Sequence, residues 1–455
     1  HKSNNIYLFY YKKKGIIYQK CYDDTCIKKI ETAPHLLYQT SAAKAKIEKS
    51  IACKDNELPT PDDVSLAEYF VQWSPRLAPC TKGQQRLWYC YHDDVGYWKE
   101  MKHGVVMNMM MTEFREYVAQ QFNKAIEKTH GEDEELIAVA ATVDAQLNAV
   151  RSLEGIAKCV RWKLSIQGKI EWNKNPMYTV FPNGVLQLDK RDSIHSKLYY
   201  FGKTDPEEYV NDERCWKLPY GCPPLNFDGS YITEAEDLLR DWIDLVQPVP
   251  EDKCLLLTYL GLVLKAINYK KMIINVGHTG DNAKSSFFEM LVDLAGGYGV
   301  TGDKNLIVKG KKDRVSKAVL HLARIVLFEE PDPTKPLDIE FLKDLIGGAT
   351  KAAARLNFSN DNEILLHCKT VLNANTMTTV QLEEAIMTRL LYLAWTTKFT
   401  SDPEKVDPKN RIYLADEKFK TAAYWDSKAN GLLWLLLNHY RLFELQGNKL
   451  KISAR

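Results

Sequence analysis

The chain has 455 residues, of which 45% are hydrophobic and 26% are charged, and its formal net charge is +2. Because single hydrophobic cores stop growing at roughly 250 to 300 residues, this length predicts two or three domains of an ordinary globular protein. The net charge is too small to argue for or against binding of nucleic acid. No run of about 18 uncharged apolar residues and no signal peptide is visible, so we expect a protein that is neither membrane-spanning nor secreted.

The N-terminal stretch "NIYLFYYKKKGIIYQKC" alternates apolar and polar residues around "KKKG", which predicts a hairpin. It leads to the pair Cys21 and Cys26, and the other cysteines, ten in all, are scattered, which fits a reducing compartment. The chain begins "HKSNNIYLF" without an initiating Met, so we expect a fragment of a longer polypeptide. The polar segment "CKDNELPTPDD" is a predicted linker.

The region from Ser65 to about residue 160 mixes an aromatic strand pair, "RLWYCYHDDVGYWKEM", with helical periodicity. The helical segments are "TEFREYVAQQFNKAIEK" and "EELIAVAATVDAQLNAVRSLEGIAKCV". In the following "YTVFPNGVLQLDKR", Asn183-Gly184 predicts a turn between two strands. The Pro- and Gly-rich interval "KLPYGCPPLNFDGS" predicts a domain boundary.

A phosphate-binding loop is predicted farther along, where the strand "KMIINV" is followed by "VGHTGDNAKSS" and by a helix ending near Gly296-Gly297. In the motif G-x-x-x-x-G-K-[ST], glycines let backbone N–H groups surround phosphate, while Lys and Ser/Thr meet phosphate oxygens and Mg²⁺. Residues expected at the nucleotide are Gly277, Gly280, Asn282, Ala283, Lys284, Ser285 and Ser286.

Ala283 stands where the second glycine of the motif belongs. A functional site, an inactive one and a chance match are the alternatives. A Cβ at this position costs nothing if the native φ is negative, and alanine adds the smallest side chain.

Two carboxylates follow about forty residues later, where "RIVLFEEPD" predicts a buried parallel strand ending at Glu329 and Glu330. Open α/β sheets bind ligands at this carboxyl edge. One carboxylate would orient Mg²⁺ and the other would polarise the attacking water. The alternative is an apolar strand that ends in solvated acids.

Two further polar residues are expected to contribute to the site. Asn375 ends "CKTVLNAN", where it would hold the nucleophilic water, although an asparagine in a turn is common. Arg389 lies in the largely apolar "EEAIMTRLLYLAW". We interpret it as an arginine finger for the γ-phosphate of a neighbouring subunit; the alternative is an arginine that extends to solvent.

Between the strand that ends at Glu329 and Glu330 and the later Asn375 lies "IGGATKAAARLNFSNDNEILLHCK". This segment predicts a loop or hairpin that carries Lys351 and Arg355. In a ring, such a loop points into the central channel and can bind the phosphates of a single strand. The alternative is a solvated basic turn.

The order of these motifs, "GHTGDNAKSS", "VLFEE", "GGATKAAARL", "VLNAN" and "TRLLYLAW", resembles superfamily 3 helicases. It is most similar to the primase-helicases of nucleocytoplasmic large DNA viruses, of the poxvirus and asfarvirus type. The family implies an α/β fold with an AAA+-like core, a parallel sheet and flanking helices, preceded by a mixed α+β module and a small zinc-binding hairpin. The presence of Lys284, Ser285, both glutamates, Asn375 and Arg389 together favours a functional nucleotide site.

The N-terminal text resembles the zinc motif of archaeo-eukaryotic-type primases, and this resemblance implies His1, Cys21 and Cys26 as zinc ligands. The fourth ligand would lie upstream of His1. The alternative is two unrelated cysteines and a chance histidine. The resemblance implies four parts: residues 1–45 (zinc motif and linker), 46–222 (α+β module), 223–400 (helicase core) and 401–455 (helical lid).

The family implies the helicase portion of a viral replicative primase-helicase. ATP, Mg²⁺ and Zn²⁺ are the implied cofactors. A homo-hexamer on single-stranded and forked DNA, an upstream primase domain in the same polypeptide and other viral replication proteins are the implied partners, in the host cytoplasm and without membrane association. An AAA+ remodeller of proteins and a nucleic-acid-binding scaffold that does not hydrolyse nucleotide are the alternatives.

Overall fold

Two compact units divide the chain in the computed structural model. They are His1–Pro75 with Met109–Val160, and Arg76–Asn108 with Arg161–Arg455. The described residues are 6–11, 16–21, 36–38, 58–74, 76–82, 85–166, 170–191, 199–221, 241–277, 280–310, 317–347, 351–354, 362–375 and 384–452. Within these ranges, no helix combines the length and the apolar character that crossing a bilayer requires.

A small antiparallel sheet forms near the N-terminus. Its strands are β1 (Ile6–Tyr11), β2 (Ile16–Cys21) and β3 (Leu36–Tyr38). Strands β1 and β2 pair with Ile6 opposite Cys21, so the hairpin predicted from the alternating pattern is confirmed.

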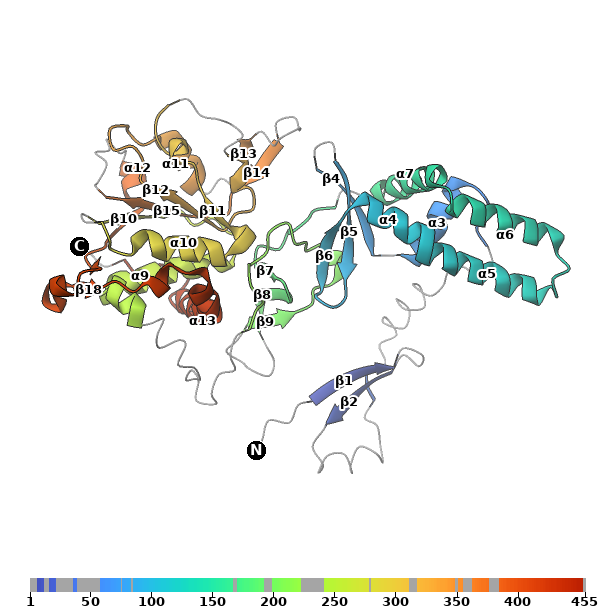
Figure 1. Cartoon of the computed structure of the whole chain (residues 1–455), viewed down its shortest axis with the longest axis horizontal. Coiled ribbons are helices and arrows are strands. Elements are labelled where there is room, and N and C mark those ends of the chain that lie inside the picture. Colours follow the sequence, from blue (N-terminus) through green and yellow to red (C-terminus); the bar gives the residue numbers. More distant parts are fainter. Residues whose placement is uncertain are drawn as a thin grey trace. The chain divides into compact units, whose positions relative to one another are not determined.

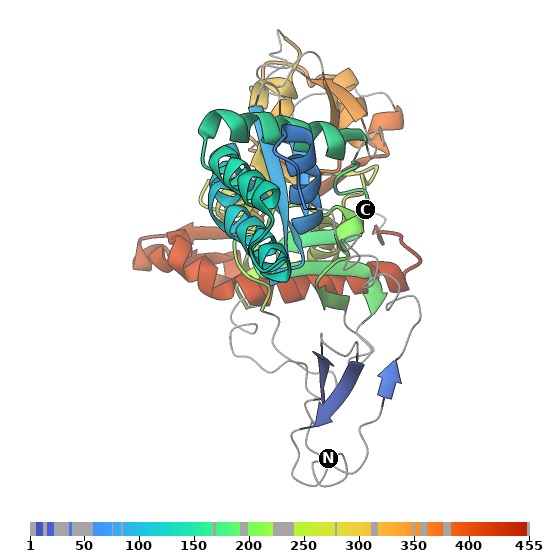
Figure 2. The same cartoon turned by 90° about the vertical axis from the view of Figure 1, so that its right-hand side faces the viewer.

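The first unit is otherwise helical. It contains α3 (Asp63–Trp73), the π-helical turn η1 (Met110–Phe114), α5 (Arg115–Lys128), α6 (Glu134–Leu147) and most of α7 (Val150–Ile166). Helices α5 and α6 lie side by side (Figures 1 and 2). Arg115 joins them through two hydrogen bonds to the Asp144 carboxylate, of 2.7 and 2.8 Å. The segment predicted to be helical from residue 134 is two helices, because the chain turns at Asn148.

The second unit begins with two antiparallel sheets. The first contains β4 (Leu77–Lys82), β5 (Gln85–His92) and β6 (Tyr97–Met101), followed by α4 (His103–Met109). The second contains β7 (Tyr178–Phe181), β8 (Gly184–Arg191) and β9 (Tyr199–Gly202). The predicted aromatic strand pair is β5 and β6, and the predicted turn at Asn183-Gly184 joins β7 to β8.

The rest of the second unit is a mixed α/β core. Its strands are β10 (Met272–Val276), β11 (Gly299–Thr301), β12 (Ile325–Glu329), β13 (Lys351–Ala354), β14 (Asn362–Leu365), β15 (Lys369–Ala374), β16 (Leu390–Ala394), β17 (Lys398–Thr400) and β18 (Ile412–Leu414). Its helices are 241–246, α9 (Pro250–Gly261), α10 (Lys284–Leu294), α11 (Ile339–Ile346), α12 (Glu384–Met387) and α13 (Ala422–Leu445). Short 3₁₀ turns are η2 (Pro206–Glu208), η3 (Leu262–Leu264), η4 (Gly296–Tyr298), η5 (Lys304–Leu306), η6 (Ala318–Leu320), η7 (Pro403–Lys405), η8 (Pro408–Asn410) and η9 (Glu417–Lys420).

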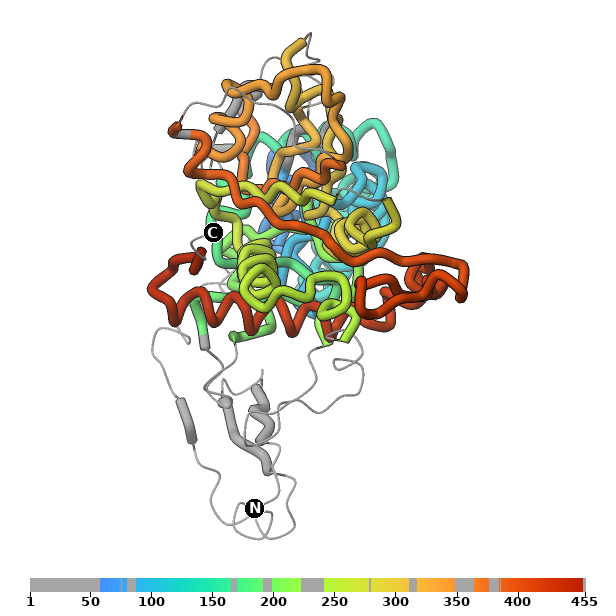
Figure 3. Tube along the Cα trace, turned by 90° about the vertical axis from the view of Figure 1, so that its left-hand side faces the viewer, coloured from blue at the N-terminus to red at the C-terminus, as the bar shows by residue number. Residues whose placement is uncertain are grey.

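Five strands form a parallel sheet in the order β11-β12-β15-β10-β16. Successive side chains of a strand point to opposite faces, and both faces here are apolar. On one face, Ile273, Val371 and Leu391 pack with α9, α10 and α13. On the other, Ile274, Leu372 and Leu390 pack with α11 and α12. Helices α9 and α13 lie side by side beneath the sheet (Figures 1 and 3).

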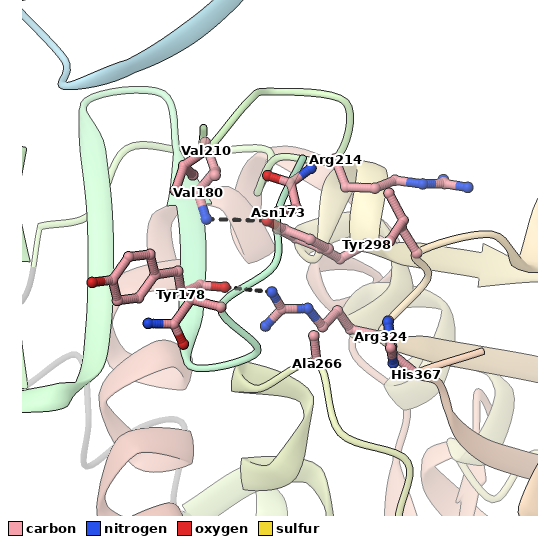
Figure 4. Close-up of a pocket in the computed structure, with 11 residues that line it drawn as sticks. Asn173, Tyr178, Val180, Val210, Arg214, Ala266, Tyr298, Arg324 and His367 are labelled. Atoms are coloured by element: carbon pink, nitrogen blue, oxygen red, sulfur yellow. Dashed lines mark hydrogen bonds between the residues drawn. The ribbon is translucent and has the colours of Figure 1, made fainter. Parts of the chain in front are cut away.

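Arg324, buried just before β12, connects the sheet to β7 through hydrogen bonds (Figure 4). Its guanidinium donates to Thr179 Oγ1 and to the Leu264 carbonyl, both at 2.8 Å, and to the Tyr178 carbonyl. The Arg324 guanidinium also stacks 4.6 Å from the ring centre of Tyr298. These contacts satisfy a charge that would be costly to bury without partners.

Arg324, Tyr178 and Tyr298 line a small cavity of about 30 Å³, and His367 lines it too. Burial lowers the pKa of this imidazole to about 4, and the positive charges of Arg324, Lys369 and His321 add to the effect. Since the ordinary value is 6.5, the unfolded chain binds a proton here that the folded chain rejects, and stability is lost as the pH falls from 6.5 towards 4.

We expect His367→Gln to flatten the acid limb of the stability curve. Between pH 7 and pH 4.5 the wild type should lose about 2 kcal/mol more unfolding free energy than the variant, as the shift in pKa implies. Urea unfolding at the two pH values measures this difference. Equal losses in both proteins would mean that His367 is protonated in the fold.

Candidate nucleotide-binding site

The carboxyl ends of the parallel strands bring the predicted phosphate loop and carboxylates together. Strand β10 leads into the loop, β12 ends at Glu329, and β15 ends at Ala374 with Asn375 next to it. Because β15 lies between β10 and β12, the asparagines of β15 lie between the loop and the carboxylates. This is the edge at which α/β sheets bind ligands.

Within the loop, the Asn282 side chain lies against Gly277. A Cβ on Gly277 would overlap Asn282 Nδ2, so a larger residue at this position would force the buried Asn282 side chain to move. Gly277 lies seven residues before Lys284, whereas the first motif glycine lies six before its lysine, so the match at Gly277 is inexact. The position with motif spacing is His278, outside the described residues. Gly280 is exposed and Ser286 is half-buried.

Asp281 and Ala283 both adopt positive φ, of 58° and 60°, while Asn282 between them does not. When the sign of φ alternates from one residue to the next, successive backbone N–H groups turn towards one concave side. This geometry binds anions. Helix α10 begins at Lys284 immediately afterwards, and its N-terminus adds a positive dipole end. The loop is therefore shaped for an anion such as phosphate.

The condition under which a Cβ at Ala283 would cost nothing, a negative φ, is not met. With φ 60° and ψ 7°, Ala283 is left-handed, the region in which a Cβ crowds the backbone. Glycine carries no such penalty. The alanine thus adds strain to the loop rather than a neutral methyl group.

We expect Ala283→Gly to raise the free energy of unfolding by up to about 1 kcal/mol, because relief of the left-handed strain exceeds the entropy that glycine loses on folding. Ala295, at the other end of α10, has φ −66° and serves as the matched control. Ala295→Gly should lower stability, since its backbone is already favourable for alanine. Urea unfolding of both variants checks the prediction, and destabilisation at both positions would contradict it.

Lys284 is 3% exposed, and its ammonium group points at the end of β15. Its Nζ donates to the Ala374 carbonyl at 2.7 Å and to Asn375 Oδ1 at 3.3 Å. Burial lowers the pKa of Lys284, while the charges of Glu329 and Glu330 act in the opposite direction. A buried cation between the loop and two carboxylates is suited to a polyanionic ligand.

Ser285 and Glu329 place oxygen atoms side by side. Ser285 Oγ donates to Glu329 Oε2 at 2.9 Å, and Asn373 Nδ2 donates to Glu329 Oε1 at 2.8 Å. Burial raises the pKa of Glu329, and the hydrogen bonds from Asn373 and Ser285 partly offset this. A hydroxyl and a carboxylate are ligands that Mg²⁺ prefers, so the donor set fits this cation.

Glu330 has a strained backbone, with φ 42°. Its N–H donates to the Asn373 carbonyl at 2.9 Å, and its carboxylate accepts from Asn375 Nδ2 at 2.7 Å. Strain of this kind in a non-glycine residue persists where surrounding contacts enforce it, and it concentrates at functional sites.

A cavity of about 490 Å³ adjoins Glu330 and Asn375. Its other polar lining residues are Lys304, Asn305, Asp332 and Lys335. The volume lies within the range of roughly 300 to 1,000 Å³ that small-molecule sites occupy. The carboxylate of Glu330 and the amide of Asn375 therefore face a space that can admit a ligand and water.

Arg389 lies at the opposite edge of the sheet. It precedes β16, whose first residue pairs with Met272 at the start of β10. A strand of five residues spans about 17 Å, so Arg389 is too far from the loop after β10 to reach its own site. The structure thus leaves Arg389 outside the group formed by Lys284, Glu329 and Asn375.

The predicted hairpin is formed by β13 and β14. Lys351 pairs with Leu365 at the open end of this hairpin, away from its turn. Arg355 lies outside the described residues. The DNA-binding roles of both residues stay predictions.

The zinc motif lies largely outside the described part of the chain. Cys21 is the last residue of β2, and His1 and Cys26 are not among the described residues. Among the residues that are described, no group of three His, Cys, Asp or Glu side chains is arranged to hold a metal ion. Zinc binding stays a prediction.

Three buried residues at the carboxyl edge were not predicted as part of the site: Asn275, Asn373 and Trp395. Asn373 is fully buried and contacts Glu329, and Asn275 Nδ2 donates to Asn373 Oδ1 at 2.9 Å. Trp395 Nε1 in turn donates to Asn275 Oδ1 at 2.8 Å. The sequence carried one signal of this arrangement, an asparagine inside each of two strands, since buried polar side chains need partners.

No protein-family model and no curated protein matches the sequence. Among solved structures, the apo A form of the NrS-1 C-terminal region superposes with a TM-score of 0.42 at 10% identity, covering 83% of this chain and 71% of that one. Its 305–718 form gives 0.34 at 10% identity, over 58% and 57%. The JCV helicase with a bound phenylacetamide compound gives a TM-score of 0.29 at 14% identity, over 50% of this chain and 64% of that one. These superpositions are too loose to add to the geometry of the site.

Proposed function

We propose that this chain is the ATP- and Mg²⁺-dependent DNA helicase portion of a viral primase-helicase, of the superfamily 3 type that its motifs resemble. One observation carries the proposal: five residues from three separate motifs lie together at one sheet edge. These residues are Lys284, Ser285, Glu329, Glu330 and Asn375.

Each residue has a role that its contacts support. Lys284 would meet the β- and γ-phosphates at the N-terminus of α10, and the loop N–H groups would bind further phosphate oxygens. Ser285 and Glu329 would hold Mg²⁺, which neutralises charge on the phosphates when it is bound. Glu330 would accept a proton from the attacking water, and Asn375, bonded to Glu330, would orient that water.

A ring of subunits would explain why Arg389 lies away from the nucleotide site of its own chain. The arginine lies at the sheet edge away from its own site, so a phosphate contact requires a second copy of the chain. In a homo-hexamer, Arg389 would act on the nucleotide of the neighbouring subunit, and the β13–β14 hairpin would carry Lys351 and Arg355 towards DNA in the channel. Zinc at His1, Cys21 and Cys26, an upstream primase domain, other viral replication partners and a site of action in the host cytoplasm belong to the same proposal.

ATP hydrolysis and DNA binding test the proposal together. We expect ATP turnover that single-stranded DNA stimulates, DNA affinity that falls steeply with salt, and loss of turnover in Lys284→Ala. Turnover without DNA binding would instead indicate a remodeller of proteins. DNA binding with bound but unhydrolysed ATP would indicate a scaffold.

A further inference from the structure

Four residues at the carboxyl edge are connected by hydrogen bonds that cross neighbouring strands. Asn275 of β10 is in register with Asn373 of β15, and Asn373 is in register with Glu329 of β12. Trp395 follows the edge strand β16, and its backbone N–H donates to the Val276 carbonyl at 2.8 Å. Register partners point to the same face of a sheet, which here is the face that α10 covers.

The indole of Trp395 determines which way the amides point. An indole N–H can only donate, so the atom of Asn275 that it meets must be the carbonyl oxygen. The Asn275 amino group then faces Asn373, which must present its own oxygen to it. The Asn373 amino group is left to face Glu329 Oε1 at 2.8 Å.

The Glu329 carboxylate accepts hydrogen bonds only, so it favours the same order of amides, and the Trp395 donor fixes that order from the other end. An asparagine amide can turn over within the same space, and a reversed Asn373 would place its oxygen against the Glu329 carboxylate. Two acceptors facing each other would repel. Asn275 and Asn373 are both fully buried, so water cannot supply a substitute partner.

We propose that Trp395, Asn275 and Asn373 are positioning residues: their hydrogen bonds cross the sheet, turn the Asn373 N–H towards Glu329 and hold this carboxylate for Mg²⁺. The inference rests on the proposed function, because it concerns a ligand of the metal that accompanies the nucleotide. It adds to that function a chain of residues that do not themselves touch nucleotide or metal.

The test compares ADP binding in saturating MgCl₂ and in EDTA, by calorimetry. In Trp395→Phe the ring still packs near Phe287 and Phe288, but the N–H is lost. We expect ADP affinity in EDTA to equal that of the wild type. The factor by which Mg²⁺ tightens binding should fall roughly tenfold, as for other residues that support a metal ligand.

Trp425→Phe is the matched control. Trp425 is also buried, and its Nε1 donates to the Phe419 carbonyl at 2.8 Å, but it belongs to α13 and not to the chain of amides. This variant should keep the full Mg²⁺ effect. An equal loss of the Mg²⁺ effect in both variants would overturn the inference, because the loss would then reflect general loosening of the core.

A second variant separates positioning from stability. Asn275→Leu leaves the Trp395 N–H without its acceptor, whereas Asn275→Leu combined with Trp395→Phe removes both groups, so the double variant should be the more stable. The Mg²⁺ effect should nevertheless stay low in the double variant, because Asn373 has lost its orientation. Recovery of the Mg²⁺ effect together with stability would overturn the inference.

The wild type distinguishes this inference from the proposed function. If wild-type ADP binding is absent or insensitive to Mg²⁺, the proposed function fails and the inference fails with it. If the wild type shows the Mg²⁺ effect and Trp395→Phe retains it in full, the inference alone is wrong.

Discussion

Glu330→Gln is expected to lower kcat for ATP hydrolysis about 10²- to 10⁴-fold, the contribution of a well-placed general base. Glutamine keeps the shape of the side chain and still offers an oxygen to Asn375 Nδ2, so the local geometry should persist. The substitution removes the negative charge that polarises water. ATP affinity, measured by equilibrium binding, should therefore stay close to that of the wild type while turnover is lost.

Glu329→Gln supplies the comparison for this prediction. Glu329 contacts Ser285 and Asn373, so its loss should chiefly raise the Mg²⁺ concentration needed for half-maximal turnover. Turnover retained in Glu330→Gln would remove the general-base assignment. If Glu329→Gln abolishes turnover and Glu330→Gln alters the Mg²⁺ requirement, the two roles are reversed.

Arg389→Ala is expected to lower kcat about 10³- to 10⁵-fold, the range measured for arginine fingers. Affinity for single-stranded DNA should be retained, because Arg389 precedes β16 of the parallel sheet, whereas β13 and β14 form a separate two-stranded sheet.

Mixing experiments test whether this arginine acts on a neighbour. When the variant is added to wild-type protein, ATPase activity should fall more than in proportion to the wild-type fraction, since each variant subunit inactivates an adjacent site. A strictly proportional fall would mean that Arg389 acts, if at all, within its own chain.

The strands of the core were predictable, and the reason is visible at β10, β12 and β15. Each is a short buried strand with apolar side chains on both faces, and each is followed by polar residues that parallel pairing brings to one edge. The residue types and their order along the sequence were therefore enough to group Lys284 with Glu329 and Asn375.

The details that depend on register or on backbone hand were not predictable. The contact of Asn275 with Asn373 exists because β15 lies between β10 and β12. This strand order cannot be predicted from the order of the strands along the sequence. The left-handed conformation of Ala283 depends on a loop held elsewhere, where the Phe399 N–H donates to the Asp281 carbonyl at 2.7 Å. Alanine disfavours the left-handed region, so the residue type predicts the opposite hand from the one observed.

Strand β16 separates two of the residues discussed above, with Arg389 immediately before it and Trp395 immediately after it. All five of its residues are paired with β10, so the strand cannot slide without breaking that whole ladder. Under the proposed assembly, one short strand would therefore hold both the arginine that contacts a neighbour and the tryptophan that orients the amides. Subunit association and readiness of the metal ligand would then be mechanically coupled through a single short segment of backbone.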